Sequence, residues 1–306
     1  ANPEMLDSVT NYECYKGLYS SHNDKNYFEI DYSINRQSGA NGGIYRNINL
    51  YNFVDNHDVN RLASTLVNPA YLPLVYTLMY CMPGIPSIYY GSEYGIQGRK
   101  ENNSDDNLRP CLFLADMEKE NTDLYRHIVK LGRIYRAYPA VRTGSYERVI
   151  ITNQQLLFKK IQGDQTVYVA LNLSEYEYDL NFGTHLPALV DVLSASEISV
   201  NNGNAYVKMP PFSSMIIVSD DIVNSAAEAE PEVQEIPDTT ETEIVIGGKY
   251  RHFKGGEYEL LSVARHSENN EELVIYKSLK DGQVWARPKA MFVGMAGDVR
   301  RFTLHD

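Results

Sequence analysis

Residues 220–243 (DDIVNSAAEAEPEVQEIPDTTETE) constrain the fold of this 306-residue chain more than any other segment. They carry nine acidic residues and no basic residue, with Ala, Pro and Thr between them. Such a segment buries too little apolar surface to offset the conformational entropy lost on ordering, so we expect a disordered acidic linker. The chain is therefore expected to fold in separate parts, with residues 244–306 forming a small C-terminal domain.

Residues 1–144 show strand-like runs that alternate with helical patterns. The expected elements are strands at residues 5–12 (MLDSVTNY), 50–54 and 88–90, helix fragments and loop between the first two strands, and helices at residues 69–82 and 122–138. The last helix has an N-cap residue at Thr122, ends before Pro139, and repeats apolar residues at helical spacing, Leu124, Ile128, Leu131 and Tyr135. Strands that alternate with helices predict an α/β fold with a parallel sheet.

The pattern changes after residue 144. Residues 145–219 form short alternating or β-branched runs separated by turn residues, which is typical of an antiparallel β-sandwich. Residues 244–306 contain further short strand candidates, YELLSVA, ELVIYKSL and VWARP, with GG and DG turns. We expect this last part to be a small β-barrel-like or strongly bent sheet.

Charge and cysteine content exclude some classes of function. The formal net charge of −12 disfavours nonspecific binding to nucleic acid or to anionic membranes. No apolar stretch is long enough to span a bilayer, so no membrane partner is expected. Cys14, Cys81 and Cys111 have no metal-like spacing, and such a sparse, odd set favours reduced thiols and a cytoplasmic location.

The segment YNFVDNHDVNR at residues 51–61 places polar groups directly after an apolar strand. In an α/β barrel, side chains at the carboxyl ends of the strands carry the chemistry. Carboxylates there suit a glycosidase, because they stabilise an oxocarbenium-like transition state and accept hydrogen bonds from sugar hydroxyls. The same residue types also form helix caps and Asx-turns after strands, so both interpretations stand at this point.

A second segment, PGIPSIYYGSEYG at residues 83–95, narrows the interpretation. FVDNHD followed by this segment resembles the α-amylase superfamily of glycoside hydrolases, where the two segments are the ends of barrel strands seven and eight. MLDSVTNY resembles strand six, SDDNLRP at residues 104–110 resembles the segment after strand eight, and residues 145–219 resemble the C-terminal β-domain of the family. The resemblance implies that residues 1–144 are the last three β/α units of an incomplete (β/α)8 TIM barrel.

The resemblance also implies roles for individual residues. Asp58 is expected to stabilise the transition state, and His57, Asn56 and Arg109 are expected to lie at the substrate. Arg61 and Glu93 are expected to support the loops of the site, and a surface or packing role is an alternative for Arg109. The implied substrate is an α-glucan or maltooligosaccharide, hydrolysed with retention of configuration.

Two catalytic carboxylates of that family have no counterpart in this sequence. We find no Gly-x-Arg-x-Asp run for the nucleophile and no strand-end Glu motif for the general acid/base. We therefore expect a fragment of a longer enzyme that is inactive alone and whose partner is the missing N-terminal half. Domain B, which often holds calcium in the family, is also missing, so no cofactor is expected.

The tail resembles a small bacterial domain family of unknown function, through YRHFKGG, ARHSE, VIY and W-RP-MF within residues 249–292. Two interpretations are open. In the first, polar and aromatic residues form a ligand or peptide pocket, namely Arg251, His252, His266, Glu268, Trp285 and Arg287. In the second, Trp285, Tyr250 and Phe292 form the core of a small barrel. For the whole chain, the alternative to the hydrolase is a carbohydrate- or partner-binding protein without catalysis, built from the β-domain and this tail.

Overall fold

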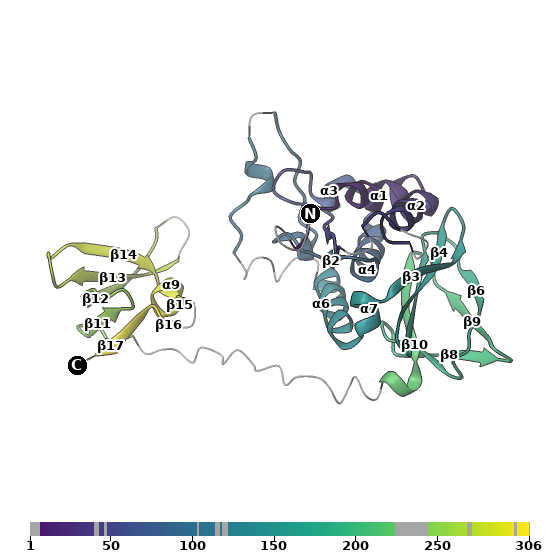
Figure 1. Ribbon diagram of the computed structural model, residues 1–306. Helices are drawn as coiled ribbons and strands as arrows, with labels where there is room; N and C mark the ends of the chain where they lie inside the picture. Colours follow the sequence, from purple (N-terminus) through teal and green to yellow (C-terminus); the bar gives the residue numbers. More distant parts are fainter. Residues whose placement is uncertain are drawn as a thin grey trace. The chain divides into compact units, whose positions relative to one another are not determined.

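The computed structural model describes residues 7–39, 43–45, 48–102, 104–113, 117, 122–223, 244–267, 271–296 and 299–305. The chain divides into two compact units, Ala1–Glu230 and Pro231–Asp306 (Figure 1). The first residues of the predicted disordered linker are ordered instead, because residues 220–223 are helical and Ile222 and Val223 pack on the core of the first unit. The remaining linker residues, 224–243, lie outside the described residues.

A short parallel ribbon positions the candidate site. Strand β1 (Tyr51–Asn52) pairs in parallel with β2 (Ile85–Pro86), and Thr10 forms a parallel bridge with Tyr51. The predicted strands at 5–12 and 50–54 therefore lie side by side, although residues 1–6 are outside the described part. Gly84 allows this register, because its φ is +123° and a Cβ atom there would lie 2.6 Å from the Leu50 carbonyl oxygen.

The third predicted strand is placed wrongly by three residues. Ile88–Tyr90 does not join the ribbon; β2 lies at Ile85–Pro86 instead. The backbone N–H groups of Ile85 and Ser87 donate to the Leu50 and Asn52 carbonyls at 2.8 and 2.9 Å. The last hydrogen bond of this ladder is donated by Ser87, so Ile88–Tyr90 lie in the loop that follows β2.

Two helices occupy the stretch that was expected to be helix fragments and loop. They are α1 (Tyr12–Asn23) and α2 (Tyr27–Ser38), and each has 12 residues. The buried face of α1 contains Gly17, Ser20, Ser21 and His22 beside Cys14 and Leu18, so its helical period is hidden from a search for aliphatic residues. Close packing explains the small residues, because a Cβ atom on Gly17 would lie 2.9 Å from Ile30 Cδ1.

The other helices before β3 include the two predicted ones and several short ones that were not predicted. They are α3 (Leu62–Thr65), η1 (Pro69–Tyr71), α4 (Leu72–Cys81), η2 (Ser92–Tyr94), η3 (Asp106–Leu108), α6 (Thr122–Ala137) and α7 (Pro139–Thr143). The predicted helices at 69–82 and 122–138 are confirmed. Pro139 ends α6 as expected and begins α7, where its missing N–H costs nothing. Ile134, rather than the predicted Tyr135, continues the buried stripe of α6.

Eight antiparallel strands follow in one continuous sheet, so the predicted antiparallel arrangement is confirmed. They are β3 (Ser145–Ile151), β4 (Gln155–Gln162), β5 (Gln165–Asn172), β6 (Tyr178–Gly183), β7 (Leu189–Asp191), β8 (Ser196–Asn201), β9 (Asn204–Met209) and β10 (Ser213–Ser219). The order is β3-β4-β5-β10-β7-β8-β9-β6. The predicted two-layer sandwich is therefore a single sheet that curls into a nearly closed barrel.

Alternating side chains on the central strands build two cores. Phe158 and Val169 join the core shared with α1, α2, α4 and α6, whereas Leu157 and Tyr168 join the core inside the curled sheet. The helices accordingly lie on one side of the sheet (Figure 1). The predicted boundary at residue 144 thus separates helices from strands that share a core.

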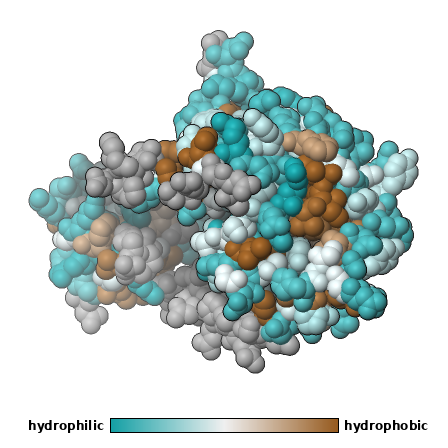
Figure 2. All heavy atoms as spheres, turned by 45° about the vertical axis from the view of Figure 1, so that its right-hand side comes forward, coloured by the Kyte–Doolittle hydropathy of each residue, from teal (hydrophilic) through white to brown (hydrophobic). Residues whose placement is uncertain are grey.

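Figure 2 shows one face of the molecule, which is mostly hydrophilic with a few hydrophobic patches.

The second unit is a bent antiparallel sheet with the order β14-β13-β12-β11-β17. Its elements are β11 (Lys249–His252), β12 (Glu257–Arg265), β13 (Glu272–Ser278), β14 (Val284–Pro288), α9 (Lys289–Val293), β15 (Met295–Ala296), β16 (Val299–Arg300) and β17 (Phe302–His305). Its core contains Tyr250, Leu260, Val274, Tyr276, Phe292 and Phe302. Trp285 was expected in this core, but its side chain is exposed on β14. Among the described residues, no helix combines the length and apolar character needed to span a bilayer.

Candidate active site at the carboxyl end of the ribbon

The polar segment after β1 divides into a buried part and an exposed part. Asp55 is 2% exposed, whereas the side chains of His57 and Asp58 are 55% and 51% exposed. Asn56 accepts a hydrogen bond from the Asp58 backbone N–H at 2.8 Å, which forms an Asx-turn. The turn places Asp58 at the carboxyl end of the parallel ribbon, beside the loop that follows β2. This end of the ribbon, with the exposed residues 56–58, is called the rim below.

Asp55 holds the two loops of the rim together. Its Oδ2 accepts from the Leu62 backbone N–H at 2.8 Å, at the start of α3, and both carboxylate oxygens lie within 2.9 Å of the Ser92 hydroxyl. Burial raises the pKa of Asp55, and these hydrogen bonds partly oppose that effect. The cap and turn interpretation is therefore confirmed for Asp55 and Asn56, whereas His57 and Asp58 remain exposed and available to a ligand.

Arg61 is the buried cation beneath the rim. Its side chain is completely buried, and it donates to the Tyr90 carbonyl at 2.6 Å and the Leu108 carbonyl at 2.9 Å. It also donates to the Ser92 hydroxyl at 2.9 Å, and its guanidinium lies 4.2 Å from the centre of the Tyr89 ring. Arg61 thereby joins three segments that meet at the site: the loop after β1, the loop after β2 and η3.

The exposed part is a small cluster of charges. Asp58 Oδ2 lies 3.2 Å from His57 Nε2, and Asp58 Oδ1 lies 3.5 Å from Arg109 Nη2. The same Arg109 nitrogen lies 3.2 Å from Asp105, and Arg109 Nε donates to the His57 carbonyl at 3.4 Å. These side chains are half exposed, so their mutual attraction contributes little to stability and leaves their oxygen and nitrogen atoms accessible.

The structure thus brings four of the predicted site residues together at the rim, namely Asn56, His57, Asp58 and Arg109, with Arg61 below them. Glu93 lies elsewhere, near buried Asp55, and its Oε2 is buried without a hydrogen-bond partner in the described part of the chain. Sequence reasoning missed Ser92 and Asp105. The motif SEY could not reveal Ser92, because its role depends on two loops meeting in space.

This cluster can accept and donate hydrogen bonds to a polyhydroxylated ligand. The Asp58 carboxylate offers two acceptor oxygens, His57 offers a ring nitrogen, and Arg109 offers N–H donors. Within the residues that the structure describes, no group of three or more His, Cys, Asp or Glu side chains is arranged to hold a metal ion.

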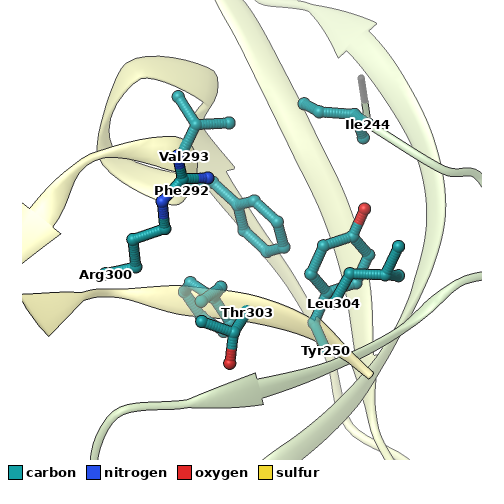
Figure 3. A pocket seen from close by; sticks show the side chains of 8 residues that line it. Ile244, Tyr250, Phe292, Val293, Arg300, Thr303 and Leu304 are labelled. Carbon is teal, nitrogen blue, oxygen red and sulfur yellow. The ribbon is translucent and has the colours of Figure 1, made fainter. Parts of the chain in front are cut away.

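A second candidate site lies in the tail unit. A cavity of about 310 Å³ is lined by Ile244, Tyr250, Phe292, Val293, Arg300, Phe302, Thr303 and Leu304. Figure 3 shows the Tyr250 and Phe292 rings turned toward this space, with Arg300 at one side and Leu304 at the other. The Phe292 and Phe302 rings stack at 4.2 Å between centres and form its apolar wall.

The tail residues predicted to form a pocket do not line this cavity. Arg251 pairs with Glu257 at 2.8 Å, His252 packs 4.8 Å from the Phe302 ring, and Arg287 lies 5.7 Å from the same ring. Burial, Arg287 and other nearby cations lower the pKa of His252. Trp285 is half exposed, and Glu268 lies outside the described residues. Phe302 and Phe292 therefore organise this unit, and the predicted polar residues lie around them.

Comparisons with known proteins find relatives of both units. The family profile described as "Alpha amylase, catalytic domain" matches residues 5–132, and the profile "Protein of unknown function (DUF1653)" matches residues 248–304. A cyclomaltodextrinase of Geobacillus thermopakistaniensis is 26% identical over 167 residues, which cover 53% of this chain and 28% of that protein. The chain thus spans less than a third of the length of this relative.

Solved structures show the same fold. The maltogenic amylase from S. marinus matches with a TM-score of 0.58 and 27% identity, over 71% of this chain and 29% of that one. An α-amylase from Geobacillus thermoleovorans, solved in complex with acarbose, matches with a TM-score of 0.60 and 18% identity, over 70% of this chain and 48% of that one. Residues 5–132 therefore belong to the α-amylase catalytic-domain family, and residues 248–304 belong to the DUF1653 family.

Proposed function

We propose that the first unit contributes the Asp58 side of an α-glucan-hydrolysing active site. The observation that carries this proposal is the exposed cluster of Asp58, His57 and Arg109 at the carboxyl end of the parallel ribbon. The family of residues 5–132 and the acarbose bound to one structural relative support an α-glucan or maltooligosaccharide as the ligand.

In this proposal, Asp58 binds hydroxyls of the sugar ring that undergoes cleavage and stabilises the positive charge that develops on it. His57 donates a hydrogen bond to the same ring, and Asn56 keeps the turn in place. Arg109 holds Asp58 near Asp105 when the site is empty. Arg61 positions the loops through the Tyr90 and Leu108 carbonyls and Ser92, and it does not touch the substrate because its side chain is completely buried.

Retaining hydrolysis also needs a nucleophile and a general acid/base, and these groups act as a unit with the third carboxylate. No Gly-x-Arg-x-Asp run is present in the 306 residues. We infer that both groups come from polypeptide outside this sequence, which would be the partner of this unit, and that the present chain does not hydrolyse α-glucosides alone. A cytoplasmic location remains part of this proposal, on the basis of cysteine usage.

Calorimetric titration of the full chain with maltoheptaose tests the proposal, with a chromogenic α-maltoside as the probe of turnover. We expect binding without turnover, and at least a tenfold weaker affinity in Asp58→Asn, because the variant loses a charged acceptor. Asp106→Asn is the matched control, since it removes an equal charge from exposed η3 nearby. Equal affinity of wild type and Asp58→Asn, or turnover of the α-maltoside by the wild-type chain, contradicts the proposal.

A second candidate function is ligand binding by the tail unit, without catalysis. The observation that favours it is the cavity between α9, β11 and β17, with an aromatic wall and Arg300 at its margin. Such a site suits a ligand with an apolar body. A screen for ligands that raise the melting temperature tests this function. Arg300→Gln is the test variant and Arg251→Gln is its control. Phe292→Ala is less suitable, because it would enlarge the cavity but also disturb the core.

A further inference from the structure

Lys160 is a buried cation at the opposite end of the first unit. It lies on β4, its side chain is completely buried, and its Nζ has no hydrogen-bond partner among the described residues. Its strand partner is Tyr146, and the neighbouring Lys159 points to the other face of the sheet, where it pairs with Glu147 at 2.9 Å. A buried ammonium without a partner is costly, so this position needs an explanation.

Among the described residues, no acidic group compensates Lys160. The ionisable group that influences it most is the Cys81 thiol at the end of α4, and burial raises the pKa of that thiol to about 12, so it stays neutral. The Tyr146 hydroxyl, also held neutral by burial, donates to Asp31 at 2.8 Å. The Asp31 carboxylate also pairs with Arg148 at 2.8 Å, so its charge is compensated by Arg148 and not by Lys160.

A cavity of about 290 Å³ opens beside Lys160. Its walls come from the amino ends of the ribbon strands, the end of α2 and the turn between α7 and β3, and the lining residues are Ser38, Gly39, Tyr45, Ile48, Asn49, Leu50, Pro83, Gly84, Arg142, Thr143, Gly144, Ser145, Tyr146 and Lys160. Among the described residues of this lining, the charged ones are Lys160 and Arg142, and both are cationic. The Arg142 guanidinium is anchored to the Tyr135 and Arg136 carbonyls, so its charge is held in place.

We propose that this cavity binds a small organic anion, a carboxylate or a phosphate monoester, whose oxygen atoms accept hydrogen bonds from Lys160 Nζ. Two cations without an acidic residue in the lining create a site of positive potential, and an oxyanion supplies the missing partner. The volume corresponds to roughly ten water molecules, which suits a small metabolite and not an oligosaccharide. The site is independent of the sugar site, because it uses the opposite ends of β1 and β2.

Acetate and inorganic phosphate are the probes that test this proposal, each added to the full chain at constant ionic strength with chloride as the reference anion. We expect at least one of them to raise the melting temperature of the wild type by about 5 °C at saturation. Lys160→Met should abolish the shift. Lys159→Met, which removes a lysine from the same strand on the other face, should retain it.

The choice of anion then identifies the ligand class: a shift with acetate only indicates a carboxylate, and a shift with phosphate only indicates a phosphate ester. NMR of chains labelled at the lysine side chains gives a second measurement, in which the Lys160 signal moves on anion addition. Lys160→Gln replaces the Met variant if circular dichroism shows that the latter is unfolded. An equal temperature shift in the Lys160 variant, or no shift of the wild type with either anion, would overturn the proposal.

Discussion

The two ends of the parallel ribbon differ in the exposure and the pairing of their charged side chains. At the carboxyl end, His57, Asp58 and Arg109 are half exposed and pair with one another. At the amino end, Lys160 is completely buried and has no hydrogen-bond partner among the described residues. Water solvates the first group at little cost to stability, whereas the second group loses its hydration and gains no counter-charge.

Burial alone does not fix the effect of a charged group on stability, because the effect also depends on its hydrogen-bond partners. Beneath the exposed rim, buried Arg61 donates from both Nη atoms to two backbone carbonyls and Ser92, and these bonds offset the cost of burying its charge, although its Nε has no hydrogen-bond partner among the described residues. Lys160 lacks such partners. We therefore expect substitutions to have opposite effects at these two buried cations and almost no effect on stability at the rim.

The largest effect is expected for Arg61→Ala. The substitution removes the donors of the Tyr90 and Leu108 carbonyls and leaves buried Asp55 without its neighbouring cation. We expect a loss of about 3–5 kcal/mol in the free energy of unfolding, measured by urea denaturation. Arg126→Ala, at a side chain that is 72% exposed on α6, should change it by less than about 0.5 kcal/mol. Similar losses in both variants would contradict the role assigned to Arg61.

Lys160→Met should stabilise the protein near neutral pH. Burial lowers the pKa of Lys160 to about 8, below the value of about 10.4 in an unfolded chain. Between these pH values the unfolded chain binds more protons than the folded one, so wild-type stability rises with pH because of this group. The variant should therefore be more stable by on the order of 3 kcal/mol below pH 8, and the difference should vanish above about pH 10. A difference that is constant with pH would show that Lys160 is not a buried charge.

Tyr146→Phe should cause a smaller loss at the same buried end. The Tyr146 hydroxyl donates to Asp31 at 2.8 Å and joins α2 to β3. Its removal leaves a buried carboxylate oxygen without one donor, so we expect a loss of about 1–2 kcal/mol in the free energy of unfolding. Tyr176→Phe, at a side chain that is 71% exposed, serves as the control and should be neutral. Equal effects of the two substitutions would show that the hydrogen bond between Tyr146 and Asp31 does not stabilise this unit.

The smallest effect on stability is expected for Asp58→Asn. The Asp58 side chain is 51% exposed and its pairing with Arg109 spans 3.5 Å, so the free energy of unfolding should change by less than about 0.5 kcal/mol. Thermal unfolding and maltoheptaose binding should be measured on the same sample. A destabilisation comparable to that of Arg61→Ala would mean that Asp58 is a structural residue of the rim.

Much of the fold could be predicted from the sequence where local pattern and tertiary packing agree. The helix at 69–82, the end of α6 before Pro139 and the short antiparallel strands after residue 144 followed from apolar spacing and turn residues. Helix α1 could not be recognised in this way, because Gly17 and its polar neighbours bury a face that has few aliphatic residues. The strand at 88–90 was misplaced, because the ladder with Leu50 and Asn52 sets the register and not the apolar run.

The polar groups after β1 can be read from the sequence alone, because FVDNHD contains the residues that form the turn, accept from the Leu62 backbone N–H and carry the exposed carboxylate. The composition of residues 220–243 predicted two separate parts, and the structure divides the chain between Glu230 and Pro231. Tertiary packing sets which aspartate is buried, Asp55, and which is half exposed, Asp58. It also placed Ser92 between Arg61 and Asp55 and left Lys160 beside a cavity. The physical reason is that local propensity acts over a few residues, whereas burial and the pairing of charges depend on segments that meet only in the folded chain.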